Sequence, residues 1–317
     1  MTDRKEPLVI LTGPTAVGKT KLSIALAKAV GGEIISADSM QVYRHMDIGS
    51  AKIRPEEMQG VPHYLVDVLE PWEEFHVVRF QQMAKEAMKE IRGRGHIPLL
   101  VGGTGFYIQA IAGDVDFTEN EASPYRQELE RLAAEQGAQA LHEELRKVDE
   151  ASADAIHAHN VKRVIRALEF HRMTGRKISE HNEEQRKKES PYHCAYFVLN
   201  DDRDRLYARI EQRIDEMLGE GLLEEVIRLK EMGLQRGMVS MQGLGYKELL
   251  AYLDGECTLA EAVEILKRDT RHFAKRQLTW FRREPDVVWL NKKEYGYDEE
   301  KILAAMLDIL REKEIIR

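Results

Sequence analysis

Segments with strand character alternate with helical ones along the first third of the chain. Residues 8–12 and 33–37 have the apolar character of buried strands, and residues 19–30 between them have helical spacing. The same order repeats with a helix predicted over 80–91 and a strand over 98–101. Alternation of this kind predicts a parallel β-sheet flanked by helices, and hence an α/β fold.

The pattern changes after about residue 115. From 125 to 174 nearly every residue fits a helix, whereas 175–191 is polar and charged, as expected of a surface loop or connection. Strand character then returns at 195–199. We therefore expect an all-helical insertion domain, residues 116–190, within an α/β catalytic core that is formed by residues 1–115 and 191–317.

The C-terminal third is mostly helical. Helices are predicted over 203–230, 246–253 and 259–283, and a last strand over 287–290 precedes a terminal helix. The core is therefore expected to end in a group of helices that adds one more strand to the sheet.

The composition is that of a globular protein without a membrane span. The chain has 317 residues, of which 43% are hydrophobic and 32% charged, and its net charge is −8. No apolar run approaches the roughly 20 residues that cross a bilayer, and the N-terminus lacks the apolar segment of a signal peptide. The two cysteines, Cys194 and Cys257, lack metal-ligand spacing and are expected to be reduced thiols. We therefore expect a cytoplasmic protein with no membrane partner.

The strongest chemical signal is a glycine-rich segment between the first strand and the first helix. It fits the phosphate-binding pattern GxxxxGK[ST], and its residues are Gly13, Pro14, Thr15, Ala16, Val17, Gly18, Lys19 and Thr20. Backbone N–H groups of such a loop surround phosphate oxygens, the lysine adds a point charge, and the threonine hydroxyl can hold Mg²⁺. A phosphorylated ligand is therefore expected, on a P-loop NTPase-like sheet.

Asp38 directly follows the second predicted strand. Ligands of open α/β sheets bind beyond the carboxyl ends of the strands, so Asp38 is expected beside the phosphate loop. There its carboxylate can accept a proton from a nucleophile or help to hold Mg²⁺. Position alone also allows a structural role, in which Asp38 caps the following turn.

The strand predicted over 98–101 ends in glycines where an ordinary P-loop ATPase has an aspartate that steadies Mg²⁺. The residues that follow it are Gly102, Gly103, Thr104 and Gly105. The glycines allow a ligand or backbone to approach closely, and Thr104 can donate to a phosphate or a base. The same residues also fit a plain strand-to-helix turn, but the missing acid makes NTP hydrolysis less attractive.

Three arginines lie on one stripe of the helix predicted over 203–230. Arg205, Arg209 and Arg213 recur at every fourth residue, so their side chains share a face. Such a stripe is either a solvated surface or part of a diphosphate clamp, and the spacing supports both interpretations equally.

Two segments are richer in basic than in acidic residues, although the whole chain is acidic. They cover residues 160–190 and 264–284. In the second segment the candidates for stacking on bases are His272, Phe273, Trp280 and Phe281. Each segment alone also fits a solvated helix, but together they indicate two surfaces for a polyanion.

Five motifs together resemble the tRNA dimethylallyltransferases, also called tRNA isopentenyltransferases. They occur in that family's order over most of the chain, at residues 13–20, 36–43, 46–52, 102–107 and 274–282. The resemblance is to the bacterial form, since no zinc-finger cysteines follow residue 290 as they do in some eukaryotic relatives.

The resemblance implies a specific reaction. Members transfer a dimethylallyl group from dimethylallyl diphosphate to the exocyclic amine of the adenosine immediately 3′ of the anticodon, in tRNAs that read codons beginning with U. Mg²⁺ assists and diphosphate leaves, so the phosphate loop would hold the prenyl donor in place of ATP. The expected partners are the donor and the tRNA anticodon stem-loop, and we expect a monomer.

The resemblance also assigns roles to residues of this chain. Asp38 would be the general base, with Thr20 on Mg²⁺ and Arg213 on the diphosphate. The positions that would contact tRNA are Asp38, Ser39, Met40, Gln41, Thr104, Arg126, Lys162, Arg163, Val164, Ile165, Arg166, Lys275, Arg276, Gln277, Leu278, Thr279 and Trp280.

Three other functions fit part of the sequence. A small-molecule kinase or other P-loop NTPase needs only the phosphate loop and leaves the insertion and the basic C-terminal helix unexplained. A noncatalytic RNA-binding protein regulated by nucleotide has no use for Asp38 beside that loop. An enzyme that prenylates free adenine nucleotides should lack an insertion that contacts tRNA.

Overall fold

Within the residues that the computed structural model describes, six parallel strands form one sheet, in the order β3-β2-β4-β1-β5-β6. They are β1 Glu6–Thr12, β2 Gly32–Ala37, β3 His63–Tyr64, β4 Ile97–Gly102, β5 Tyr192–Asn200 and β6 Val287–Asn291. In the central strand β1, the side chains of residues 8–11 are fully buried, as expected for a parallel strand covered on both faces. The predicted α/β fold is confirmed. The sequence did not predict β3, because two residues are too few to show a period.

The structure describes residues 5–117 and 124–317. The chain forms two units, of which one combines Met1–Ala112 with Pro191–Arg317 and the other is Gly113–Ser190. The first division follows Ala112, where the sequence analysis places it after residue 115. Residues 1–4 of the expected core and 118–123 of the expected insertion lie outside the described residues.

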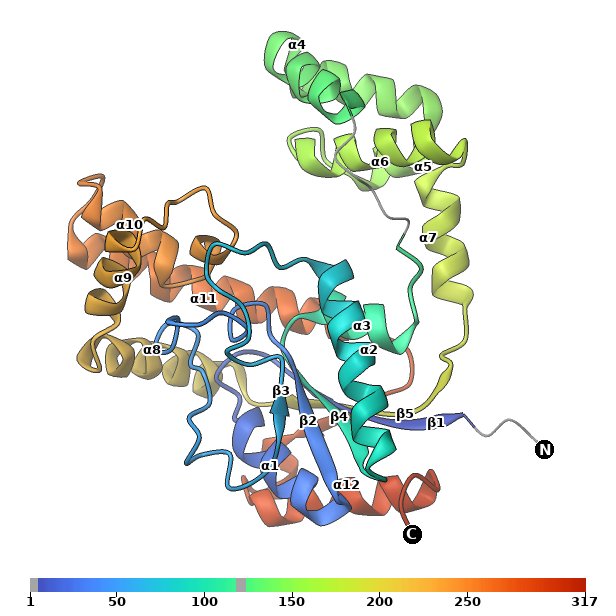
Figure 1. Cartoon of the computed structure of the whole chain (residues 1–317), viewed down its shortest axis with the longest axis vertical. Helices are drawn as coiled ribbons and strands as arrows, with labels where there is room; N and C mark the ends of the chain where they lie inside the picture. Colours follow the sequence, from blue (N-terminus) through green and yellow to red (C-terminus); the bar gives the residue numbers. More distant parts are fainter. Residues whose placement is uncertain (1–4, 118–123) are drawn as a thin grey trace. The chain divides into compact units, whose positions relative to one another are not determined.

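Helices cover both faces of the sheet (Figure 1). α1 (Lys19–Val30) and α12 (Glu299–Glu312) pack together on one face, and α2 (Val77–Gly93) and α3 (Gly105–Ala112) pack together on the other. Because all strands run in the same direction, the loops that follow them lie at one edge of the sheet. The residues that directly follow the five longer strands are Gly13, Asp38, Gly103, Asp201 and Lys292.

The C-terminal part of this unit contains further helices. They are α8 Arg203–Gly219, α9 Leu222–Glu231, α10 Tyr246–Leu253 and α11 Leu259–Phe281, with short 3₁₀ turns η1 Ser240–Gln242 and η2 Lys292–Tyr295. The prediction of one helix over 203–230 is wrong. Gly221 has a φ of 101°, a left-handed conformation that interrupts the helix and that glycine adopts readily.

In the described part of the unit Gly113–Ser190, residues 113–117 and 124–190, all regular structure is helical. Its helices are α4 Pro124–Val148, which is kinked at Gly137, α5 Glu150–Ala155, α6 Val161–Thr174 and α7 Ile178–Lys187. Its own apolar core includes Leu141, Leu145, Val164 and Leu168, each nearly or fully inaccessible to solvent. A separate core is what an independently packed domain requires.

The expectation of a loop over 175–191 is wrong, because α7 occupies most of it. This helix has little apolar periodicity and is held by polar contacts instead. The backbone N–H and the hydroxyl of Ser179 both donate to the carboxylate of Asp149, at 3.0 and 2.7 Å. Lys187 also pairs with Glu183 one turn away. The bonds of Ser179 join it to a residue 30 positions away, so they leave no local pattern in the sequence.

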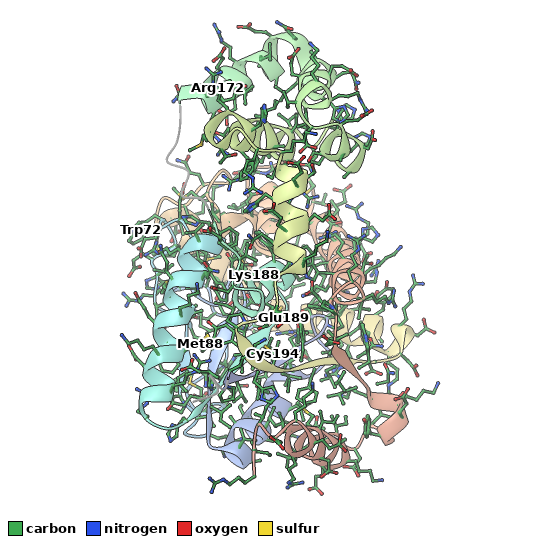
Figure 2. The ribbon with its side chains drawn as sticks, turned by 90° about the vertical axis from the view of Figure 1, so that its right-hand side faces the viewer. Trp72, Met88, Arg172, Lys188, Glu189 and Cys194 are labelled. Carbon is green, nitrogen blue, oxygen red and sulfur yellow. The ribbon has the colours of Figure 1, made fainter. Side chains whose placement is uncertain are left out.

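The two cysteines lie in different segments of the core and do not form a disulfide with each other. Cys194 lies on β5 (Figure 2), and Cys257 lies in the connection between α10 and α11. Among the described helices, none has both the length and the apolar character that a membrane span needs.

A buried carboxylate on β2 makes the fold sensitive to acid. Glu33 is 2% exposed and accepts hydrogen bonds from Arg94, His96 and Tyr64. Burial by itself raises the pKa of Glu33, but these donors outweigh it and lower the pKa to about 2. A depressed carboxyl pKa stabilises the folded protein above the ordinary value of 4.5, and this stabilisation is lost as the pH falls through about 2.

We therefore expect Glu33→Gln to lower the free energy of unfolding at neutral pH by up to about 3 kcal/mol. The difference from the wild type should shrink as the pH falls below about 4.5. Urea unfolding at pH values between 7 and 3 measures it. A difference that stays constant over this range would show that the ionised form of Glu33 has no special role.

Candidate active site

The phosphate loop joins β1 to α1 and depends on two glycines. Gly13 has a φ of 146°, and a Cβ atom there would lie 2.2 Å from the carbonyl oxygen of Leu199 on β5. Gly18 caps α1 in a left-handed conformation, with a φ of 101°. A side chain at either position is therefore incompatible with the loop, which explains the spacing of the motif.

The lysine of the motif reaches back across its own loop. Its Nζ donates to the carbonyl oxygens of Gly13 at 3.0 Å and Pro14 at 2.8 Å. Burial lowers the pKa of Lys19 to about 8, against an opposite effect of the Asp38 carboxylate and a smaller lowering by Arg213. An anion bound in the loop would replace these carbonyl partners and stabilise the charged form of Lys19.

Asp38 directly follows β2. The sequence analysis offered two roles for it, a carboxylate beside the phosphate loop and a cap of the following turn. Its Oδ1 accepts from the backbone N–H of Met40 at 2.8 Å and of Gln41 at 3.3 Å, so it does cap the following turn. Its charge also acts on the pKa values of Lys19 and Arg213. One carboxylate oxygen thus fixes the orientation of the side chain, while the group as a whole remains beside the phosphate loop.

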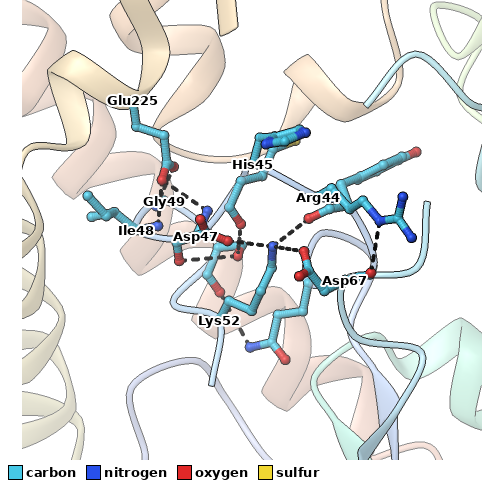
Figure 3. A network of polar contacts seen from close by, with 12 residues as sticks. Arg44, His45, Asp47, Ile48, Gly49, Lys52, Asp67 and Glu225 are labelled. Atoms are coloured by element: carbon cyan, nitrogen blue, oxygen red, sulfur yellow. Dashed lines mark hydrogen bonds and ion pairs between the residues drawn. The ribbon is translucent and has the colours of Figure 1, made fainter. Parts of the chain in front are cut away.

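The segment after Asp38 is held by a buried carboxylate that the sequence analysis missed (Figure 3). Glu225 on α9 accepts from the N–H groups of Asp47, Ile48 and Gly49 at 2.9, 2.8 and 3.1 Å. The hydroxyl of Tyr246 also donates to it, at 2.8 Å. A carboxylate with this many donors anchors the loop firmly to α9.

A lysine ties the same segment from the other side (Figure 3). Lys52 donates to the carbonyl oxygen of Tyr43 at 2.6 Å and forms ion pairs with Asp47 and Asp67. The amide of Gln41 donates to the carbonyl oxygen of Ala51 at 3.1 Å. These contacts hold the backbone that orients Asp38.

Two glycines, Gly102 at the end of β4 and Gly105 after it, allow close approaches. A Cβ atom on Gly102 would lie 2.2 Å from the carbonyl oxygen of Ala37, and one on Gly105 would lie 2.3 Å from the Trp280 ring. The N–H of Thr104 donates to the same Ala37 oxygen at 3.1 Å. Thr104 is therefore bound directly to the residue before Asp38, so the two predicted site residues are neighbours.

Gln277 on α11 joins the two glycine-rich loops. Its side-chain oxygen accepts from the N–H of Thr15 at 2.9 Å, and its side-chain nitrogen donates to the carbonyl oxygen of Gly103 at 2.9 Å. Only 6% of Gln277 is exposed. This finding differs from the expected RNA contact, because both ends of the side chain already have protein partners.

The three arginines of α8 do not act as one stripe. Arg213 is half-buried, burial lowers its pKa, and the Asp38 carboxylate raises it again. Arg209 points to the carbonyl oxygen of Val17, with Nη1 at 3.5 Å, whereas the guanidinium of Arg205 lies over the ring of Tyr297. Arg213 is thus the arginine of the three that interacts with Asp38, and the stripe is not simply a solvated surface.

One end of α11 carries exposed basic residues around a hollow of about 420 Å³. The residues that line it are His272, Lys275, Arg276, Thr279, Trp280 and Arg283. Trp280 is half-buried and meets the ring of Phe106 edge-on, with 6.2 Å between the centroids. Leu278 is half-buried as well. The suggestion that Phe281 stacks on a base is wrong, because its side chain is fully buried in the core.

In the helical unit, the segment 162–166 divides between surface and core. Lys162 and Arg163 are exposed and Arg166 is half-buried. Val164 and Ile165 are 0% and 3% exposed and belong to the apolar core. The expectation of RNA contacts by these two side chains needs correction, since helical spacing turns them inward.

Arg126, the other predicted RNA contact in the helical unit, is paired within the protein. Its guanidinium donates to both carboxylate oxygens of Glu169, with the closest approach at 2.8 Å. Glu169 is 2% exposed, while the Arg126 side chain is 44% exposed. A fixed, partly exposed guanidinium of this kind can still meet a phosphate with its outer edge.

Known proteins resemble this chain over nearly its whole length. The sequence matches the family described as IPP transferase over residues 41–284 and the one described as Isopentenyl transferase over residues 7–68. A tRNA dimethylallyltransferase of Lachnoclostridium phytofermentans is 65% identical over 313 residues, which are 98% of this chain and 100% of that protein.

Solved structures of tRNA-modifying transferases also resemble this chain. The tRNA isopentenylpyrophosphate transferase of Bacillus halodurans is 46% identical, with a TM-score of 0.74 over 98% of both chains. A eukaryotic dimethylallyltransferase acting on tRNA is 30% identical, with a TM-score of 0.79 over 90% of this chain and 74% of that one.

Proposed function

The chain belongs to the IPP transferase family, and on this premise we propose that it is a tRNA dimethylallyltransferase. It transfers a dimethylallyl group from dimethylallyl diphosphate to the exocyclic amine of an adenosine in tRNA and releases diphosphate. The acceptor is the adenosine immediately 3′ of the anticodon, in tRNAs that read codons beginning with U. We expect it to act as a monomer, in the cytoplasm where its substrate tRNA is found.

One observation carries this proposal. A complete phosphate loop and a carboxylate lie at the same edge of the sheet, and the strand between them, β4, ends without an acid. Asp38 interacts electrostatically with Lys19 and Arg213, which an anion in the loop would also contact. This arrangement supports transfer of a group away from a diphosphate toward Asp38 better than it supports NTP hydrolysis.

The reaction can be written with each group in place. The adenine nitrogen attacks the allylic carbon, the bond from that carbon to the diphosphate oxygen breaks, and diphosphate leaves with the electron pair. Asp38 accepts the proton that the nitrogen loses. Backbone N–H groups of residues 16–20, together with Lys19 and Arg213, stabilise the charge that develops on the leaving group. Because an aromatic amine is a weak nucleophile, placement of the base against the donor contributes much of the rate.

The loop also fits the Mg²⁺ that the family is expected to use. Thr20 lies in the first turn of α1 with its side chain exposed, so its hydroxyl is available as a ligand. Throughout the ranges that the structure describes, no group of three or more His, Cys, Asp or Glu residues could hold a metal. Mg²⁺ on a diphosphate needs no such group, since phosphate oxygens and water complete its shell. When bound, the ion neutralises charge on the leaving diphosphate.

Each unit has its own basic surface for tRNA. In the core, this surface is formed by the exposed Lys275 and Arg276 on α11, with the exposed Thr279 beside them. In the helical unit, it is formed by the exposed Lys162 and Arg163 on α6. The target adenosine must leave the stack of the anticodon loop to reach Asp38, at a cost of a few kcal/mol. Contacts of both surfaces with the tRNA backbone would offset this cost.

Reversing the charges of Lys275 and Arg276 to Glu is expected to weaken tRNA binding about 10- to 100-fold at physiological salt. The slope of log K against log salt concentration should also become shallower by about 1.5, because two phosphate contacts are lost. Filter binding at several salt concentrations measures both quantities. The control is Lys28→Glu with Lys89→Glu, which makes the same charge change at exposed residues of α1 and α2. If both double variants bind alike, the α11 surface is only a solvated helix.

The Gln277 bridge predicts a separable defect. Gln277→Met removes both bonds without changing the size of the side chain much, so we expect a KM for dimethylallyl diphosphate about tenfold higher, with tRNA affinity unchanged. The matched control is Gln235→Met, because Gln235 is an exposed glutamine of the same unit. Steady-state kinetics and tRNA binding measure the two effects. A loss of tRNA affinity with donor KM unchanged would instead support direct RNA contact by Gln277.

The proposed function has a direct test. An unmodified anticodon stem-loop that carries the target adenosine is incubated with the protein, Mg²⁺ and dimethylallyl diphosphate, and its mass is measured. We expect a gain of one dimethylallyl group. ATP hydrolysis or phosphoryl transfer without this gain would favour the kinase interpretation, and prenylation of free AMP in preference to the stem-loop would favour the nucleotide-prenylating one.

A further inference from the structure

Lys292 is a buried lysine without a close counter-ion. It opens η2 directly after β6 and is 6% exposed. No carboxylate of residues 5–117 or 124–317 lies within ion-pair distance of its Nζ. Among the described residues, the hydrogen-bond partner of the amine is the carbonyl oxygen of Val17 in the phosphate loop, at 3.4 Å. A buried ammonium with one long hydrogen bond is costly unless an anion joins it.

Arg209 converges on the same point from α8. Its Nη1 lies 3.5 Å from the same Val17 oxygen. A Cβ atom built on Gly18 would lie 3.4 Å from Lys292 Nζ and 3.5 Å from Arg209 Nη2. Burial lowers the pKa of Lys292, and the charge of Arg209 lowers it further. Two cations are therefore held together against the phosphate loop.

The charges around this pair do not balance. The nearest carboxylate, Asp201, lies 3.9 Å from both Arg205 and Arg209, and its Oδ2 has no hydrogen-bond partner. The neighbouring Asp202 is already paired with Lys293 at 3.3 Å. The charge of Glu299 also acts on Lys292, but Glu299 is paired with Lys21 at 2.7 Å. Lys292, Arg205 and Arg209 thus have Asp201 as their shared buried carboxylate, which leaves a positive surplus beside Gly18.

The topology places this surplus on the side of the loop that faces away from Asp38. In the sheet, β2 and β4 lie on one side of β1, and β5 and β6 lie on the other. Asp38 follows β2, whereas Lys292 follows β6. A diphosphate that turned its allylic carbon toward Asp38 would have its other phosphate on the β5–β6 side of the loop, where Lys292 lies.

We propose that Lys292 and Arg209 form a second anion-binding site, which takes the terminal phosphate of the donor diphosphate and of the released inorganic diphosphate. The inference rests on the proposed function, since it assumes that the loop holds a diphosphate. It assigns the two phosphates to different cations: Lys19 and Arg213 contact the one next to the allylic carbon, and Lys292 with Arg209 contacts the other. Affinity for a diphosphate over a single phosphate then comes from the second pair.

The test compares inorganic diphosphate with orthophosphate. Calorimetric titrations in excess Mg²⁺ are made with the wild type and with Lys292→Met, and Lys293→Met is the control because Lys293 is the exposed neighbour. We expect Lys292→Met to weaken diphosphate about tenfold and orthophosphate hardly at all, and Lys293→Met to change neither. Arg209→Met should reproduce the selective loss, so the result does not depend on one variant.

Several outcomes would overturn the inference. If Lys292→Met leaves diphosphate affinity unchanged, or weakens both anions equally, Lys292 only supports the Val17 carbonyl. If Lys19→Met weakens diphosphate binding while Lys292→Met and Arg209→Met leave it unchanged, the second site fails but the donor site stands. If the wild type does not bind diphosphate, the donor assignment itself fails and takes the second site with it. Because a buried unpaired ammonium is costly, Lys292→Met should be at least as stable to heat as the wild type.

Discussion

Replacing Asp38 by Asn is expected to lower kcat for prenyl transfer by about 10²- to 10⁴-fold, with little change in the affinity for either substrate. The Asn side-chain oxygen can still accept from the N–H groups of Met40 and Gln41, so the turn after β2 keeps its cap. The amide cannot accept the proton that the adenine nitrogen loses. The geometry of the site is thus preserved while its base is removed.

Single-turnover measurement of dimethylallyl transfer to an anticodon stem-loop, with separate donor and tRNA titrations, separates rate from binding. The control is Asp308→Asn, since Asp308 is an exposed aspartate on α12 paired with Arg311. Full activity of Asp38→Asn would show that Asp38 is only a structural cap. A loss of tRNA affinity with an unchanged single-turnover rate would make it a binding residue and leave the base unassigned.

Replacing Lys19 by Met is expected to weaken binding of dimethylallyl diphosphate about 10- to 100-fold, and to lower the rate of transfer as well. The ammonium is held at the mouth of the loop by the carbonyl oxygens of Gly13 and Pro14. The donor's diphosphate would replace these carbonyl oxygens, and a hydrogen bond between two charged groups is stronger than one to a neutral carbonyl. Donor affinity equal to that of the wild type would contradict the role of the loop as a diphosphate site.

The lowered pKa of Lys19 gives this prediction a pH dependence. An anion binds the protonated amine, whose pKa in the free protein is about 8. The ionisation of Lys19 should therefore not affect donor affinity below about pH 8. Above about pH 8, the loss of its proton should lower donor affinity by up to tenfold per pH unit. In Lys19→Arg the guanidinium stays charged, so the affinity difference between the two proteins should change only above about pH 8. The donor and Lys292 ionise in the same way with the wild type and with Lys19→Arg, so their effects cancel in the affinity difference between the two proteins.

Parts of the site that depend on local sequence were predictable. The phosphate loop needs two glycines and a lysine at fixed spacing because backbone N–H groups must turn inward within a few residues. Asp38 follows a strand with a readable apolar pattern, so its place at the carboxyl edge of a parallel sheet follows from topology alone. The helices at 125–174 were readable for the same reason, since each has a repeating apolar face.

Parts of the site that depend on distant partners were not predictable from the sequence. Glu225, Gln277 and Lys292 are polar residues whose roles come from contacts with loops far away in the sequence. A polar residue has no periodicity that distinguishes a buried bridge from an exposed side chain. The segment 162–166 shows the converse, because the family resemblance implied RNA contacts along all five residues, whereas helical geometry turns Val164 and Ile165 into the core.

The amino-acid sequence by itself determined the α/β class, the phosphate loop, the base candidate and the family, because these depend on short-range spacing and on the order of elements along the chain. The tertiary structure decided which of three arginines interacts with Asp38, which cations lie against Gly18, and which polar side chains join one loop to another. Those features depend on the directions and distances between helices and strands. The packing of side chains sets these distances, so no local sequence pattern encodes them.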